Sequence, residues 1–186
     1  MRIITGIARG VNLATLEGED ITRPTSERTK EGIFSAIQFE IAGKRVLDLF
    51  SGCGQMALEA LSRGAESAVM IDENAEAVEV IKANAKKTGL IKSCRISRMD
   101  YSEYLKSASG REKFDIIFLD PPYSKSMRDE ILKKLMRTDI LADGCVVICE
   151  TDMDEIDGDV HGLTLRKKYK YSRAIIYIFD YNKTEE

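Results

Sequence analysis

Residues 47–57 read LDLFSGCGQMA, in which a short apolar run leads into a glycine-rich turn and then a helical pattern. Gly52, Gly54 and Ala57 fit the spacing G-x-G-x-x-G/A of nucleotide-binding βαβ units. Glycines there permit a tight turn and let a ligand approach the N-terminus of the following helix. Asp72, at the end of the next apolar run, offers a carboxylate to ribose hydroxyls. The stretch predicts an α/β fold that binds an adenosine-type cofactor, and a tight turn without a ligand is the alternative.

Strand-like apolar runs alternate with helical patterns through the middle of the chain. The runs are residues 45–49, 67–71, 94–98, 115–119 and 145–149. Between them, apolar residues recur at helical spacing, as at Ala77, Val78, Ile81 and Ala85. This alternation is typical of a parallel sheet covered on both faces. Residues 163–170 and 174–181 predict an antiparallel C-terminal hairpin that turns around Ser172.

The first 43 residues do not follow this alternation. Residues 2–5 and 11–14 are short strand candidates, and a helix is expected to start near Pro24-Thr25-Ser26. Its apolar face consists of Ile33, Phe34, Ile37 and Ile41. At 186 residues the chain fits one domain, given about 150 residues per domain. We therefore predict a single domain over residues 1–186, with an N-terminal β-hairpin/helix extension (1–43) and a core (44–181).

Composition and charge exclude several classes of protein. The chain has 28 Lys and Arg against 31 Asp and Glu, so its net charge of −3 excludes a generic polycationic nucleic-acid binder. No apolar run approaches the roughly 20 residues of a membrane span, and the N-terminus lacks the apolar region of a signal peptide. The four cysteines form no CxxC pair and there is one histidine. We expect a cytoplasmic protein with buried free thiols, no metal and no membrane contact.

Asp48 bears on the choice of cofactor because it directly precedes the glycine-rich turn. An anion there would repel the pyrophosphate of a dinucleotide. It would attract a sulfonium or ammonium group, since a contact ion pair gains about 4 kcal/mol at an effective dielectric constant of 20. Asp48 therefore favours S-adenosylmethionine, unless its side chain instead caps a neighbouring backbone group.

Asp120-Pro121-Pro122-Tyr123 follows the strand-like run FDIIFL. Ligands of open α/β sheets bind beyond the carboxyl ends of the strands, so this tetrapeptide and the Gly52 turn should share one cleft. The Asp120 carboxylate and the Pro121 carbonyl could accept both hydrogens of an exocyclic amino group and stabilise the nitrogen as it becomes cationic. Tyr123 could stack on an extruded base. The motif predicts methyl transfer to a base amine, and a rigid Pro-Pro turn is the alternative.

Asp100 could accept from the adenine amino group of the cofactor or cap the helix expected over residues 102–106, and the sequence does not decide between these roles. The complete predicted cofactor site is Asp48, Phe50, Ser51, Gly52, Cys53, Gly54, Asp72, Glu73, Asp100 and Tyr101.

Beyond these motifs, the chain resembles the bacterial 16S ribosomal RNA (guanine-N2)-methyltransferases of the RsmD type over nearly its whole length. The resemblance is carried by MRIITG (1–6), RG (9–10), RPT (23–25), Arg28, Ile33-Phe34, DLFSGCG (48–54) and EALSRGA (59–65). Asp-Pro-Pro-Tyr is shared more widely, by amino-methyltransferases acting on DNA, RNA and protein. The chain departs from the family at Val11, often an arginine, at Cys53, usually a serine, and at Gln55-Met56, usually small or aliphatic.

The resemblance implies a Rossmann-like seven-stranded class I methyltransferase fold, S-adenosylmethionine as cofactor, and a guanine of small-subunit ribosomal RNA as acceptor. It also implies a substrate already assembled with ribosomal proteins, and we expect the enzyme to be a monomer. The N-terminal residues Arg2, Arg9, Arg23, Thr25 and Arg28 would then contact RNA, with Lys30 beside them. A solvated surface is the alternative, since Glu17, Glu19, Asp20 and Glu27 lie among them.

Rival functions remain open at this point. The tetrapeptide would also suit an amino-methyltransferase of another RNA or of DNA adenine, although no part of the chain resembles an added DNA-reading domain. A non-catalytic ribosome-assembly factor could keep the fold, but the intact residues 120–123 disfavour it. A nicotinamide oxidoreductase is the weakest rival. Because the net charge is mildly acidic, we expect isolated RNA to bind worse than a preassembled subunit.

Overall fold

A computed structural model describes residues 1–16, 26–121, 125–152, 156, 158–171 and 174–183. Seven strands form one sheet in the order β3-β2-β1-β4-β5-β7-β6. They are β1 (Arg45–Asp48), β2 (Ser67–Asp72), β3 (Cys94–Arg98), β4 (Phe114–Leu119), β5 (Leu141–Thr151), β6 (Thr164–Tyr171) and β7 (Ala174–Tyr181). Strands β1 to β5 are parallel, and β7 and β6 continue the sheet antiparallel. The predicted fold class is confirmed.

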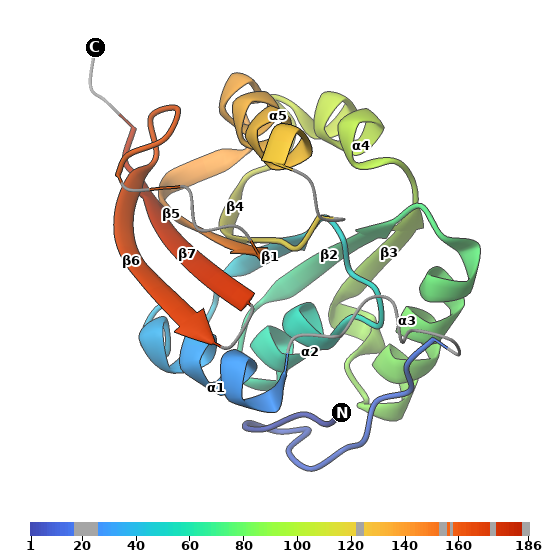
Figure 1. Ribbon diagram of the computed structural model, residues 1–186. Helices are drawn as coiled ribbons and strands as arrows, with labels where there is room; N and C mark the ends of the chain where they lie inside the picture. Colours follow the sequence, from blue (N-terminus) through green and yellow to red (C-terminus); the bar gives the residue numbers. More distant parts are fainter. Residues whose placement is uncertain (17–25, 122–124, 153–155, 157, 172–173, 184–186) are drawn as a thin grey trace.

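Helices cover both faces of the sheet, as Figure 1 shows. They are α1 (Glu27–Ala36), α2 (Gln55–Ser62), α3 (Ala75–Lys87), α4 (Tyr101–Ala108) and α5 (Lys125–Arg137), with a short 3₁₀ turn, η1 (Ile91–Ser93). Helices α1 to α3 pack on one face and α4 and α5 on the other. Side chains alternate between the faces along each strand, so Val46 joins the first core and Leu47 the second.

Two boundaries differ from the sequence prediction. Strand β5 runs over Leu141–Thr151 instead of 145–149, because Leu141 pairs with Phe114 of β4 and Thr151 pairs with Ile175 of β7. Helix α1 ends at Ala36, so Ile41 lies beyond it, although the side chain is buried in the same core. The Ser26 side chain caps α1 by accepting from the Thr29 amide, as expected. Pro24, Thr25 and the turn at Ser172 lie outside the described residues.

The N-terminal strand candidates were wrong: residues 2–5 and 11–14 form only one isolated bridge, between Arg2 and Asn12. The Ile3 amide donates to the Val11 carbonyl at 3.0 Å and the Leu13 amide to the Met1 carbonyl at 2.9 Å, but two other amides donate to a helix. The Glu59 carboxylate accepts from the Ile4 amide at 2.7 Å and from the Thr5 amide at 3.0 Å. A side-chain acceptor on α2 therefore takes the Ile4 and Thr5 amides, and the pairing around Arg2 and Asn12 does not extend into a ladder.

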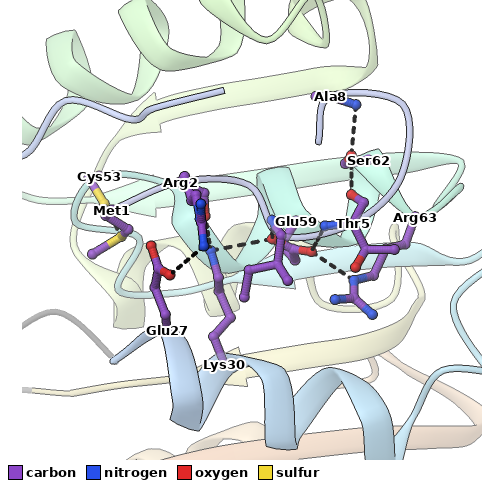
Figure 2. Close-up of polar contacts among 11 residues, drawn as sticks. Met1, Arg2, Thr5, Ala8, Glu27, Lys30, Cys53, Glu59, Ser62 and Arg63 are labelled. Carbon is purple, nitrogen blue, oxygen red and sulfur yellow. Dashed lines mark hydrogen bonds and ion pairs between the residues drawn. The ribbon is translucent and has the colours of Figure 1, made fainter. Parts of the chain in front are cut away.

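A buried ion pair holds this region together (Figure 2). Lys30 Nζ on α1 lies 3.3 Å from Glu59 Oε2 on α2, and both side chains are 0% exposed. The ammonium also donates to the Arg2 carbonyl at 2.7 Å, and Arg63 Nε donates to Glu59 Oε1 at 2.8 Å. Lys30 therefore cannot contact phosphates, which corrects its inclusion among the RNA-facing residues.

The free cysteines are mostly buried, as expected. Cys53, Cys145 and Cys149 are buried, whereas Cys94 is half-buried. Cys145 and Cys149 share the core beneath α4 and α5, as their spacing predicted. Across the described part of the chain, no helix has the length and apolar character that crossing a membrane requires.

Candidate active site

Four carboxylates gather at the C-terminal ends of four neighbouring strands. Asp48 and Asp72 end β1 and β2, Asp120 directly follows β4, and Glu150 is the penultimate residue of β5. The residue two positions before each acid packs in the core beneath α1 to α3, and alternation carries each acid to that same face. Those preceding residues are Val46, Met70, Phe118 and Ile148. We call these four acids the carboxylate cluster.

The carboxylate cluster lines a cavity of about 360 Å³. Nine of the ten predicted cofactor residues also line it: Asp48, Phe50, Ser51, Gly52, Cys53, Asp72, Glu73, Asp100 and Tyr101. Asp120 and Pro121 join them, so the structure brings the two sequence motifs into one cavity as expected. Pro122 and Tyr123 lie outside the described residues. Gly54 is the exception, since it does not line the cavity and instead precedes α2 as its N-cap.

The glycine turn, residues 50–54, is bound directly to Asp72. The Gly52 amide donates to Asp72 Oδ2 at 2.9 Å, and the Asn74 amide donates to Asp72 Oδ1 at 2.9 Å. Gly52 and Gly54 have φ of +53° and +80°, a region that other residues rarely adopt. A carboxylate oxygen can accept more than one hydrogen bond, so Asp72 stays able to bind ribose hydroxyls while it fixes the turn.

Burial raises the pKa of two members of the carboxylate cluster, Asp48 and Asp120. It raises the pKa of Asp48 to about 7, against the opposing effect of the Phe50 amide and with a further increase from Asp72. Burial also raises the pKa of Asp120 well above its ordinary range, and the neighbouring Glu150 and Asp48 raise it further. A cation placed among these acids would relieve their repulsion. The cluster therefore fits the sulfonium and ammonium groups of S-adenosylmethionine better than it fits a pyrophosphate.

We expect Asp48→Asn to stabilise the ligand-free protein more at pH 8 than at pH 5, by about 2 to 3 kcal/mol. Because the native pKa is raised to about 7, the folded state keeps a proton that the unfolded chain loses near pH 4. The contribution of Asp48 to the free energy of unfolding therefore falls between about pH 4 and 7 and is constant at higher pH. The variant has no titrating group at this position and does not show this loss. Urea unfolding of both proteins from pH 5 to 8 measures the difference, and a difference independent of pH would contradict the shift.

Asp100 caps α4, since its Oδ1 accepts from the Ser102 amide at 2.8 Å and from the Glu103 amide at 3.2 Å. The same side chain lines the cavity, so capping and contact with the cofactor are compatible, and the contact remains a prediction. Next to it, the rings of Phe50 and Tyr101 lie 5.3 Å apart, centroid to centroid. They offer an aromatic wall against which an adenine could pack.

The described basic residues of the N-terminal region lie on the surface. Arg2, Arg9 and Arg28 are exposed, and Arg2 forms an ion pair with Glu27 at 3.4 Å. Arg23 and Thr25 lie outside the described residues.

Sequence reasoning missed Glu150 and the walls that come from the N-terminal region, Leu16 and Ile33. A signal for Glu150 exists, because the apolar run CVVICE ends in an acid at the alternation of the buried Val146 and Ile148. Leu16 and Ile33 reach the cavity only through tertiary packing. In the described ranges, no group of three or more His, Cys, Asp or Glu side chains has the arrangement to hold a metal ion.

Comparisons with known proteins agree with this architecture. YlbH of Bacillus subtilis (strain 168), named provisionally as an rRNA methyltransferase, is 34% identical over 181 residues, which cover 96% of this chain and 98% of YlbH. Ribosomal RNA small subunit methyltransferase D of Escherichia coli (strain K12) is 31% identical over 156 residues, covering 83% of this chain and 76% of that protein.

Solved structures show the same fold. The Escherichia coli protein yhhF, described provisionally as a methyltransferase, matches with a TM-score of 0.87 at 26% identity over 98% of both chains. An RNA methyltransferase from Salinibacter ruber in complex with S-adenosyl-L-homocysteine matches in fold, with a TM-score of 0.68 at 16% identity over 88% of this chain and 97% of that one. The family model described as "Conserved hypothetical protein 95" matches residues 1–180. The chain therefore belongs to this family, the RsmD family of S-adenosylmethionine-dependent methyltransferases.

Proposed function

We propose that the protein methylates the exocyclic N2 amine of a guanine in 16S ribosomal RNA, with the assembled small subunit as substrate. One observation carries the proposal: Asp120 and Pro121 line the same cavity as the glycine turn, in a chain of this family. The relative in Escherichia coli is named a ribosomal RNA small subunit methyltransferase, which supports the class of acceptor.

When bound, S-adenosylmethionine supplies an electrophilic methyl group. The glycine turn and Asp72 hold its adenosine end, and Asp48 attracts its cationic end. The Phe50 and Tyr101 rings and the apolar side chain of Leu16 exclude water from the cavity that they line.

Asp120 has two roles toward the acceptor amine: it orients the nitrogen and stabilises the charge that develops on it. Its carboxylate and the Pro121 carbonyl accept the two hydrogens of the amine, which directs the nitrogen lone pair toward the methyl group. The carboxylate stabilises the positive charge that develops on the nitrogen. Because its pKa is raised by burial and by Glu150, the carboxylate can also take up the proton that the nitrogen releases. From the sequence motif we also expect Tyr123 to stack on the extruded guanine, as flipped bases require.

The test is transfer of labelled methyl from S-adenosylmethionine to small subunits from cells that lack the gene. We expect label in 16S RNA as N2-methylguanine, less label in protein-free 16S RNA, and none in subunits from wild-type cells. Label in duplex DNA but not in subunits would instead favour the DNA enzyme. Subunit binding without any transfer at saturating donor would favour an assembly factor. Either result would overturn the proposal.

The N-terminal arginines should contribute to substrate affinity. We expect the double variant Arg2→Gln, Arg9→Gln to raise the KM for subunits about tenfold at low salt, because exposed arginines bind phosphates beside the target base. The dependence of affinity on salt should become shallower, while affinity for S-adenosyl-L-homocysteine stays unchanged. Filter binding across a salt series measures both slopes, and an unchanged slope would place the RNA elsewhere on the surface.

A further inference from the structure

Asn84 is a buried polar residue in the interior of α3, and it joins two segments that lie far apart in the sequence. Its side chain is 1% exposed. Nδ2 donates to the Cys53 carbonyl at 2.9 Å and to the Ala14 carbonyl at 2.9 Å, while Oδ1 accepts from the Ala14 amide at 2.8 Å. Both donors and the acceptor of one amide are therefore used to hold the glycine turn against Ala14.

Asparagine is a weak helix former, and a buried amide is costly when it is unpaired. Neither property favours Asn84 as a simple packing residue. The Asn84 side chain instead cross-links two segments through hydrogen bonds: the glycine turn and the N-terminal segment (residues 1–16).

Two other contacts fix the N-terminal segment to the same part of the molecule (Figure 2). Glu59 on α2 holds the Ile4 and Thr5 amides, and α2 starts directly after the glycine turn. The Cys53 thiol lies 3.8 Å from the Met1 sulfur. The segment is therefore anchored to α2, to α3 and to the glycine turn itself.

The far end of the segment reaches the cavity, because Leu16 lines it two residues beyond Ala14. Asn84 therefore links the glycine turn to the segment that carries Arg2 and Arg9 and that ends in a wall of the cavity. We propose that Asn84 is a positioning residue: it couples the glycine turn to the N-terminal segment, so that binding in the cavity orders the surface that meets the acceptor. The last clause rests on the proposed function, whereas the coupling itself does not.

Calorimetry and amide hydrogen exchange with S-adenosyl-L-homocysteine test the coupling without any RNA. The test variant is Asn84→Leu, which keeps most of the side-chain volume but loses all three hydrogen bonds. The reporter is the Leu13 amide, which donates to the Met1 carbonyl at 2.9 Å, a partner that the substitution leaves in place. We expect the ligand to slow Leu13 exchange at least tenfold in the wild type and less than twofold in the variant. The Kd for the ligand should rise at least tenfold.

The matched control is Thr88→Val at the end of the same helix. It removes the hydroxyl that donates to the Asn84 and Ala85 carbonyls at 2.8 and 3.1 Å, but leaves the hydrogen bonds of the Asn84 side chain in place. We expect this control to lose thermal stability yet keep the wild-type Kd and the wild-type slowing at Leu13. If Asn84→Leu does not fold, Asn84→Ser, which retains one donor, should give an intermediate effect on both readouts.

Equal ligand affinity in the Asn84 and Thr88 variants, or equal slowing at Leu13, would reduce Asn84 to a structural residue and overturn the inference. Failure of the proposed function looks different. The wild type would then bind the ligand and show the Leu13 effect, yet transfer no methyl group to subunits.

Discussion

Asp120→Asn is expected to lower the rate of methyl transfer by about 10²- to 10³-fold or more, while the Kd for S-adenosyl-L-homocysteine changes by less than about tenfold. The variant keeps the size of the side chain and one oxygen acceptor. It loses the negative charge that stabilises the nitrogen as it becomes cationic. Single-turnover kinetics with saturating subunits measures the rate, and calorimetry measures the cofactor site.

Stability separates this effect from misfolding. Because burial and the neighbouring Glu150 and Asp48 raise the pKa of Asp120, its ionised form costs folding free energy near neutral pH. We therefore expect Asp120→Asn to be at least as stable as the wild type at pH 8. The control Asp143→Asn makes the same chemical change at an exposed residue and should transfer at the wild-type rate. A nearly full rate in Asp120→Asn would remove Asp120 from catalysis.

Glu59→Gln is expected to destabilise the protein by about 3 to 5 kcal/mol, because it leaves the fully buried Lys30 ammonium without its counter-charge. Burial already lowers the pKa of Lys30, and Glu59 is the main group that opposes this effect. The same substitution weakens the hold on the Ile4 and Thr5 amides. Urea unfolding of the ligand-free protein measures the loss.

A double-mutant cycle with Lys30→Met isolates the ion pair. The double variant should be less destabilised than the sum of the two single variants, since neither charge is then buried alone. The exposed pair Glu79–Lys82 provides the matched control, with side chains 72% and 43% exposed. Glu79→Gln should cost far less than Glu59→Gln, because solvent screens the exposed pair. Additive effects of the two buried substitutions would mean that the pair has no energetic coupling.

Local patterns predicted the fold well where they reflect burial of whole strands. The strands β3 and β7 begin and end at the residues that their apolar runs predicted, and Asp72 ends β2 as expected. The two motifs share one cavity because parallel strands present their carboxyl ends at one edge of the sheet. These features depend on alternation and turn chemistry, both of which are visible in a short window of sequence.

Features set by contacts between distant residues could not be predicted in this way. Residues 2–5 have the composition of a strand, yet Glu59, more than 50 positions away, takes the Ile4 and Thr5 amides. The sequence predicts Lys30 to be an exposed base, whereas in the structure it is buried against Glu59 of α2. The role of Asn84 likewise depends on distant residues, because its hydrogen-bond partners lie in two segments that fold against α3.

Nucleoside mass mapping of 16S ribosomal RNA tests the central claim most directly. RNA from cells with the gene, without it, and without it but carrying either the wild-type or the Asp120→Asn gene would be compared. We predict one N2-methylguanine that disappears on deletion, returns with the wild-type gene and stays absent with the variant. An unchanged set of N2-methylguanines after deletion would contradict the account.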